Sequence, residues 1–187
     1  MMNFEYINTE RLRLRKITPE VYAYVFAEYT NEEQKSFFGF NTDAELEKER
    51  GKFEKGISTF NKSFVLFQLI DKASQKIIGS CGFHTWYTDH DRAEIGYALT
   101  RDDFKGKGMM TEALAPIIQY GFERMNLNRV EAFISPGNEP SLKLVAKLNF
   151  VPEGMLRQDY FKDGKHDDSL IFSLLHSEYR QQVGNPG

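Results

Sequence analysis

The chain has 187 residues, of which 41% are apolar and 14% aromatic, and its 24 Lys and Arg against 27 Asp and Glu give a formal net charge of −3. This length and composition are typical of one globular domain with a sizeable core, and they exclude a disordered chain. The negative charge argues against a general nucleic-acid binder, which is normally basic.

The first sixty residues predict a strand followed by two helices. Leu alternates with Arg over residues 11–15, which is typical of a half-buried strand. Thr18 is suited to cap a helix over residues 19–29, and a second helix is expected over residues 44–60. The segment between them, residues 34–41, contains three phenylalanines and is expected to be a loop, whose rings either pack in the core or line a ligand cleft.

Three strands are expected next. Residues 64–70 and 77–83 are almost continuously apolar, which indicates burial on both faces of a sheet. A polar hairpin over residues 71–75 joins these two strands. A loop over residues 85–91 then leads to a third strand over residues 93–99.

A long helix is expected after the glycine-rich turn that follows. Its apolar face is formed by Met110, Leu114, Ile117, Ile118, Gly121 and Met125. Pro116 lies inside this helix, lacks a backbone donor and should bend it locally. A strand over residues 130–134 and a helix over residues 140–148 follow, and Asn149 is suited to the left-handed conformation that ends a helix.

The C-terminal segment predicts two more strands, over residues 153–161 and 166–175, joined by the hairpin signal Asp163-Gly164. Residues 181–187 are polar and are expected to be a frayed tail. We therefore expect a single domain over residues 1–180. Its class is mixed α/β, with a central mixed sheet of about seven strands and about four helices.

Residue types that would carry metal or redox chemistry are sparse. The single cysteine, Cys81, excludes a disulfide framework and a thiolate metal cluster, and its apolar neighbours predict a buried thiol rather than a nucleophile. The four histidines show no ligand spacing, so no metal site is expected. No signal peptide precedes Asn3 and no apolar run approaches the roughly 20 residues of a membrane span. We therefore expect a cytoplasmic protein without a membrane partner.

The most informative motif is the glycine-rich turn within residues 103–114. Gly106 and Gly108 let the backbone approach a ligand closely, and the helix that follows offers free N–H groups to an anion. The motif is not a P-loop, because Gly108 stands where Ser or Thr is required after Lys107. It is not a dinucleotide fingerprint either, since Thr111 replaces the third glycine.

This turn resembles the pyrophosphate-binding motif of the GNAT superfamily of acyl-CoA-dependent N-acetyltransferases. Other segments resemble the Rim-type branch, the N-terminal acetyltransferases of ribosomal proteins, at residues 8–15, 93–99, 138–141, 147–150 and 153–157. The order of expected elements also matches this superfamily. The resemblance implies a GNAT-like domain whose sheet is splayed at the cofactor site, with acetyl-CoA as cosubstrate, no metal, and an amine as acceptor.

The resemblance also implies which residues hold acetyl-CoA. The pyrophosphate would bind backbone N–H groups of Lys105, Gly106, Lys107, Gly108, Met109 and Met110. Backbone groups of Leu99 and Thr100 would contact the pantetheine arm, and the Leu99 N–H would polarise the thioester carbonyl. Asn138 would hydrogen-bond the same arm by analogy with the family, or it caps the helix that begins at Pro140.

The resemblance identifies the catalytic acid and base less completely than it identifies the cofactor-binding residues. Many members carry a tyrosine acid where this chain has Val145, so Ser141 is the nearest polar candidate to hydrogen-bond the leaving thiolate, or it is a helix residue without a further role. Glu94 and Asp159 are candidate bases acting through water. The alternative for each is an exposed or salt-bridged carboxylate.

The leading expectation for function is transfer of acetyl to a protein N-terminus, ribosomal by resemblance. An α-amine loses its proton at pH 7 for only about 1 kcal/mol, against roughly 4.6 kcal/mol for lysine, so a weak base suffices. One alternative is acetylation of a small amine such as a polyamine, an amino acid or an aminoglycoside. Another is a catalytically silent acyl-CoA-binding module. The oligomeric state stays open, with a homodimer as one alternative because dimers are common among similar proteins.

Overall fold

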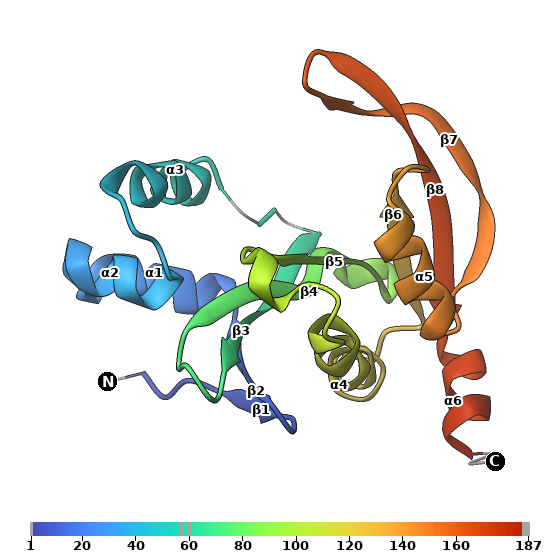
Figure 1. The fold of residues 1–187 in the computed structure, drawn as a ribbon, viewed down its shortest axis with the longest axis horizontal. Coiled ribbons are helices and arrows are strands. Elements are labelled where there is room, and N and C mark those ends of the chain that lie inside the picture. The colour runs from blue at the N-terminus through green and yellow to red at the C-terminus, as the bar shows by residue number, and fades with distance from the viewer. Residues whose placement is uncertain (1, 57, 60, 185–187) are drawn as a thin grey trace.

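The computed structural model describes residues 2–56, 58–59 and 61–184, which form an eight-stranded sheet with helices packed on it (Figure 1). The strands are β1 Tyr6–Asn8, β2 Leu12–Ile17, β3 Lys62–Asp71, β4 Ile77–Tyr87, β5 Arg92–Leu99, β6 Arg129–Ile134, β7 Val151–Lys162 and β8 Lys165–Leu175. The helices are α1 Pro19–Glu28, α2 Asn31–Phe38, α3 Asp43–Glu54, α4 Met109–Arg124, α5 Glu139–Lys147 and α6 His176–Gly184, with short 3₁₀ turns at Thr88–His90 and Asp102–Phe104.

The strand order is β1-β2-β3-β4-β5-β6-β8-β7, and every neighbouring pair is antiparallel except β5 and β6. The mixed α/β class is therefore confirmed. The described residues add one strand (β1) to the expected set, together with the helices α2 and α6. No helix among these residues is long and apolar enough to cross a membrane.

The sheet is covered on both faces by two separate hydrophobic clusters. Along β3, Val65 and Phe67 belong to the cluster under α4, whereas Phe64 and Leu66 belong to the cluster under α1, α2 and α3. Side chains alternate between the faces of a strand, so α4 and the group α1–α3 lie on opposite faces. This arrangement confirms the predicted burial of β3 on both faces.

The expected loop over residues 34–41 was wrong, because most of it belongs to α2. Thr30 caps this helix and forms a capping box with Glu33. Such a box satisfies two of the orphan donors at a helix start, and it outweighs the low helix propensity of the aromatic residues. Phe37 and Phe38 are buried in the core beneath α1–α3, which agrees with the packing alternative.

Three boundaries also differ from the sequence prediction. The helix α3 ends at Glu54, short of residue 60, and β4 continues to Tyr87 through an irregularity after Phe83. The expected loop over residues 85–91 is therefore mostly strand and a 3₁₀ turn. The helix α6 extends to Gly184, so the first residues of the expected tail are helical and residues 185–187 lie outside the described range.

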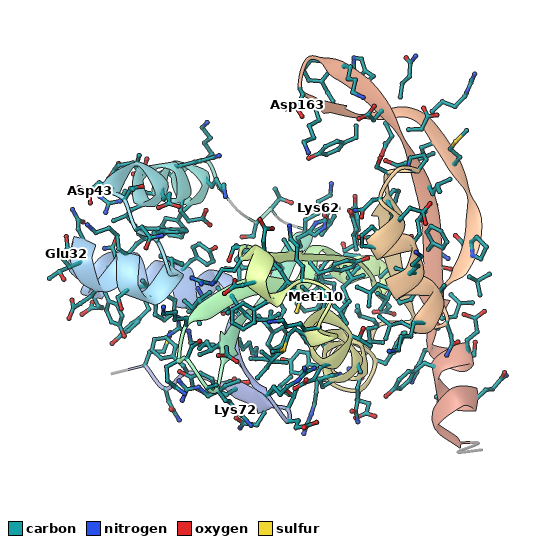
Figure 2. All side chains as sticks on the ribbon, in the orientation of Figure 1. Glu32, Asp43, Lys62, Lys72, Met110 and Asp163 are labelled. Carbon is teal, nitrogen blue, oxygen red and sulfur yellow. The ribbon has the colours of Figure 1, made fainter. Side chains whose placement is uncertain are left out.

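The β7–β8 hairpin arches away from the rest of the molecule (Figure 1). Its turn is confirmed at Asp163-Gly164, where both residues have positive φ, as a two-residue hairpin turn requires. Asp163 marks the tip, which rises on the side of the sheet where α3 lies, opposite α4 (Figure 2). Every residue of β7 is exposed, and the strand forms an edge of the sheet.

Candidate active site

The central feature of the site is a gap between two neighbouring strands. The parallel strands β5 and β6 pair through only three residue pairs, from Arg92↔Arg129 to Glu94↔Glu131. Beyond Glu94 the described strands diverge, so β5 keeps its partner β4 but has no strand on its other side. The sheet is therefore splayed at this point, as the sequence resemblance implies.

The backbone of β5 offers hydrogen-bonding groups to this gap. The N–H of Thr100 donates to the carbonyl of Ile78 at 3.0 Å, so Thr100 is bonded toward β4. Hydrogen-bonded and non-hydrogen-bonded pairs alternate along an antiparallel ladder. The backbone groups of Ile95, Tyr97 and Leu99 consequently point into the gap. The Leu99 N–H thus points into the gap, as its expected contact with the thioester carbonyl requires. The Thr100 N–H is already bonded to Ile78 within the sheet.

A pocket of about 180 Å³ fills the gap. It is lined by His84 on β4, by Glu94, Ile95, Gly96 and Tyr97 on β5, by residues 132–135, and by Asn138 and Ser141 at the start of α5. Ile95 and Tyr97 pack with the α4 cluster, so Glu94 and Gly96 face the opposite side of the sheet. The pocket therefore brings together polar side chains from both faces.

On the face opposite α4, a carboxylate lies beside a histidine. Glu94 Oε1 lies 3.4 Å from Nε2 of His84, whose ring crosses β5 above Gly96. A Cβ at Gly96 would come within 2.3 Å of that ring, so only glycine leaves room for it. Burial raises the pKa of the Glu94 carboxyl, and His84 opposes this shift. The negative charges of Glu131 and Asp159 raise the pKa further.

Asp159 does not line this pocket, but it lies close enough to affect Glu94. It belongs to a three-residue bulge of β7, residues 157–159, where the N–H of Gln158 donates to Asp168 Oδ1 at 2.8 Å. Bulges of this kind commonly redirect a side chain near a site. Asp159 is exposed, and its charge acts on Glu94 from outside the pocket lining.

On the α4 face, the pocket is bounded by the first turn of α5. Asn138 Oδ1 accepts a hydrogen bond from the Ser141 N–H at 3.3 Å, so the capping role considered for Asn138 is present. The amide nitrogen of Asn138 has no hydrogen bond to another described residue. Ser141 also lines the pocket, while Val145 is buried with an exposed fraction of 1%.

The glycine turn lies at the start of α4. Gly106 and Gly108 have φ of 71° and 75°, and Gly108 occupies the N-cap position without a side-chain cap. None of the N–H groups of residues 106–111 donates to another described residue. The Lys105 N–H is excluded from this set, because it donates to Asp102 O at 3.1 Å. The turn thus presents a row of free donors, as an anion site at a helix start does.

The positive charge of the turn is smaller than its composition suggests. The Lys105 ammonium lies 2.6 Å from an Asp102 carboxylate oxygen, and Arg101 forms an ion pair with Asp103. Lys107 makes no ion pair with a described residue, and its ammonium lies 5.9 Å from the centre of the Phe104 ring. Backbone N–H groups and Lys107 are therefore the groups that this turn offers to an anion.

A second, larger cavity of about 780 Å³ lies between the α2–α3 region and the sheet and reaches Thr100 at the end of β5. Phe38 and Phe40 line it. Aromatic residues of segment 34–41 thus pack in the core and also border a cavity, and an acceptor role for this cavity stays a prediction.

The chain matches the family described as acetyltransferase (GNAT) domain over residues 11–151, more than half of its length. The chain belongs to the GNAT family. As a member of that family it is an acetyl-CoA-dependent acyltransferase.

Sequence relatives agree with this assignment. Over 114 residues the chain is 47% identical to the uncharacterized N-acetyltransferase p20 of Bacillus licheniformis, in an alignment that covers 60% of this chain and 63% of the relative. It therefore matches a little under two thirds of that protein. Over 173 residues it is 28% identical to the uncharacterized N-acetyltransferase YoaA of Bacillus subtilis, covering 92% and 97% of the two chains.

Solved structures show the same fold. The ribosomal-protein-S5-alanine acetyltransferase of Vibrio fischeri has a TM-score of 0.65 at 22% identity, covering 94% of this chain and 98% of that one. Mutant forms of the spermidine/spermine N-acetyltransferase SpeG of Vibrio cholerae give 0.67 at 19% identity, covering 92% and 99%. At these identities the likeness shows the fold and not the acceptor.

The glycine turn at the start of α4 is held in place by residues that the sequence analysis missed. Glu112, in the first turn of α4, accepts hydrogen bonds from Thr9 Oγ1 at 2.5 Å, Arg11 N at 2.7 Å and Arg11 Nε at 2.6 Å. Arg11 also donates to the carbonyl of Lys107 at 3.0 Å. About a hundred positions separate these partners, so no local sequence pattern could have revealed the contact. His84 and Tyr97 were missed too, because the histidines were considered only as metal ligands and Tyr97 reads as an ordinary strand residue.

We expect Glu112→Ala to lower the free energy of unfolding by about 1–3 kcal/mol, because it removes three hydrogen bonds to a half-buried carboxylate. Burial alone would raise the pKa of Glu112, but the bonds from Thr9 and Arg11 lower it. The stabilisation is therefore present above the ordinary pKa of a glutamate and is lost as pH falls through the lower folded value. Urea denaturation at two pH values measures both effects.

Glu123→Ala on the same helix is the matched control, since Glu123 is exposed and, within the described part of the chain, bonds only to Gln119. We expect this variant to stay within about 0.5 kcal/mol of the parent. Equal losses from the two variants would show that the Glu112 contacts contribute nothing specific.

Proposed function

We propose that this protein transfers acetyl from acetyl-CoA to the N-terminal α-amine of a protein or peptide. The observation that carries this proposal is the pocket in the splayed sheet. It combines a carboxylate of raised pKa on one face with Asn138 and Ser141 on the other. The row of free N–H groups at the start of α4 adds an anion site.

The residues present fit acetyl-CoA. The N–H groups of residues 106–111 suit its pyrophosphate. A Cβ built at Gly106 would meet no atom of the described residues within 4 Å, which leaves the turn open to a ligand. The backbone groups of Tyr97 and Leu99 suit the amides of the pantetheine arm, and the amide nitrogen of Asn138 supplies a further donor. Bound there, acetyl-CoA supplies an activated thioester to the gap.

Glu94 is the proposed base. Its raised pKa makes it a stronger proton acceptor than an ordinary carboxylate, and it lies on the face opposite α4. As the amine nitrogen bonds to the carbonyl carbon, Glu94 takes the nitrogen proton, directly or through one water. The Leu99 N–H stabilises the carbonyl oxygen as it gains charge, a contribution typically of about 2.7–4 kcal/mol. The carbon–sulfur bond then breaks, and the departing thiolate accepts a hydrogen bond from Ser141.

An α-amine acceptor demands little of this site. At pH 7 its deprotonation costs only about 1 kcal/mol, which a single carboxylate can supply, whereas a lysine side chain would need roughly 4.6 kcal/mol. One fold neighbour is named as a ribosomal-protein-S5-alanine acetyltransferase, which supports a protein acceptor. Another is named for spermidine and spermine, so a small polyamine is the second candidate. The pocket carboxylate argues against a silent acyl-CoA-binding module.

A panel of acceptors tests this proposal. Purified protein is incubated with acetyl-CoA and a lysine-containing peptide with a free α-amine, the same peptide with a blocked α-amine, or spermidine. Released thiol and product masses are measured. We expect acetylation of the free α-amine alone. Acetylation confined to lysine, or to spermidine without peptide turnover, would overturn the α-amine assignment. Tight acetyl-CoA binding with no turnover would indicate the silent module.

We expect Asp159→Asn to shift the acid limb of the kcat/KM profile to lower pH while keeping most of the activity. The Asp159 charge contributes to the raised pKa of Glu94, so its removal lowers that pKa and leaves Glu94 deprotonated at a lower pH. Asp163→Asn at the exposed tip of the same hairpin is the control and should leave the profile unchanged (Figure 2). Loss of nearly all activity in Asp159→Asn would instead make Asp159 the base.

A further inference from the structure

One buried polar group in the pocket lacks a partner. Among the described residues, the Tyr97 hydroxyl is one of two buried side-chain polar atoms with no hydrogen bond, the other being Arg50 Nε in the α2–α3 region. Buried hydroxyls are nearly always hydrogen-bonded, because an unpaired one destabilises the folded state. Phenylalanine would fill the same space without that penalty. The hydroxyl is therefore a candidate for a partner that binds the pocket.

The position of this hydroxyl suggests what the partner is. Tyr97 lines the pocket together with Ser141 and lies on the α4 face of β5, opposite Glu94. A proton acceptor on one face and an unpaired donor on the other suit an acyl transfer through the gap, since one can take the nitrogen proton while the other meets the leaving sulfur. The position on α5 where the family often has an acid is taken by Val145, which is buried and has no proton to donate.

We propose that Tyr97 is a catalytic residue that donates a hydrogen bond to the coenzyme A sulfur as acetyl leaves it. This inference rests on the proposed acetyl transfer. As the bond from nitrogen to carbon forms and the bond from carbon to sulfur breaks, the electron pair moves to sulfur and the nitrogen proton goes to Glu94. Tyr97 keeps its proton, and solvent protonates the thiolate when it is released.

The environment of Tyr97 suits a donor that retains its proton. Burial raises the pKa of the hydroxyl, and the nearby Ser141 side chain opposes this shift, although the two hydroxyls do not reach hydrogen-bond geometry. A tyrosine of raised pKa stays protonated throughout the neutral range. Ser141 then supplies a second polar contact in the same pocket rather than the proton itself.

Tyr97→Phe separates a catalytic role from a structural one. We expect this variant to be at least as stable as the parent in urea denaturation and to bind acetyl-CoA with unchanged affinity. We expect its kcat to fall roughly 10- to 100-fold, the loss typical of a hydrogen bond to a charged group. Tyr22→Phe is the matched comparison, since that buried hydroxyl bonds Glu49 at 2.7 Å and its removal should lower stability. A destabilised Tyr97→Phe with unchanged kcat would overturn the inference.

A binding measurement makes the test independent of the acceptor. Calorimetry compares coenzyme A with its desulfo analogue in a series from about pH 7 to pH 10, over which a growing share of an alkyl thiol is ionised. We expect the parent to prefer coenzyme A and Tyr97→Phe to lose most of that preference. An equal preference in both proteins would overturn the role of Tyr97. Failure of the parent to acetylate any amine would overturn the proposed function, yet would leave this comparison measurable.

Discussion

Gly108→Asp should lower the affinity for acetyl-CoA by roughly 100- to 1,000-fold, because it places a negative charge within a few ångströms of the proposed pyrophosphate site. The new side chain would also occupy the space through which the backbone N–H groups reach the ligand. The protein should still fold, since Asp tolerates the φ of 75° better than most residues. Of the described atoms, only Arg11 Nη2 would lie within 4 Å of the new Cβ, at 3.7 Å. Calorimetric titration with acetyl-CoA measures the loss.

Gly108→Asn separates charge from size, because Asn has the same shape, adopts positive φ equally well and carries no charge. We expect this control to lose affinity by a clearly smaller factor than Gly108→Asp. Unchanged acetyl-CoA affinity in a folded Gly108→Asp protein would show that the pyrophosphate does not bind at this turn.

Glu94→Gln should lower kcat by roughly 100- to 10,000-fold, the range typical of a lost general base, while acetyl-CoA affinity changes little. Gln has the shape of Glu but accepts no proton at neutral pH. In the parent, the raised pKa of Glu94 places the acid limb of the pH profile above the usual range of a glutamate. The pH profile of the residual activity of Glu94→Gln should lack this acid limb.

Glu139→Gln is the control for this change, because Glu139 begins α5 beside the pocket, is exposed and does not line it. We expect it to retain the parental kcat. If Glu94→Gln keeps its kcat within a few-fold of the parent, Glu94 is not the base and the proposed assignment fails.

The features that the sequence predicted are those with local causes. The cap at Thr18, the positive φ of Asn149 and the hairpin at Asp163-Gly164 each depend on a few adjacent residues, and all three are present. The glycine turn could be found in the same way, because positive φ and a helix start are properties of consecutive residues. The helix α2 was missed although its capping box, Thr30 with Glu33, is also local. The three phenylalanines obscured it.

The rest of the site depends on contacts between distant segments. The divergence of β5 from β6 was expected only from the family resemblance, because no local pattern within β5 indicates it. Likewise, Glu112 meets Thr9 and Arg11 only once β1 and β2 lie beside α4. The partnerless hydroxyl of Tyr97 is invisible in a sequence, because a tyrosine on a half-buried strand usually finds a hydrogen bond.

The short pairing of β5 with β6 has a consequence for selectivity. An open sheet edge normally invites another polypeptide strand, and proteins guard such edges against aggregation. In this molecule β5 and β6 pair through only three residue pairs, and past these pairs their open edges face each other. A pocket of about 180 Å³ lies between the two edges. In the proposed binding mode, these edges favour a ligand with its own amide groups, as a pantetheine arm has. The bound arm then covers both edges.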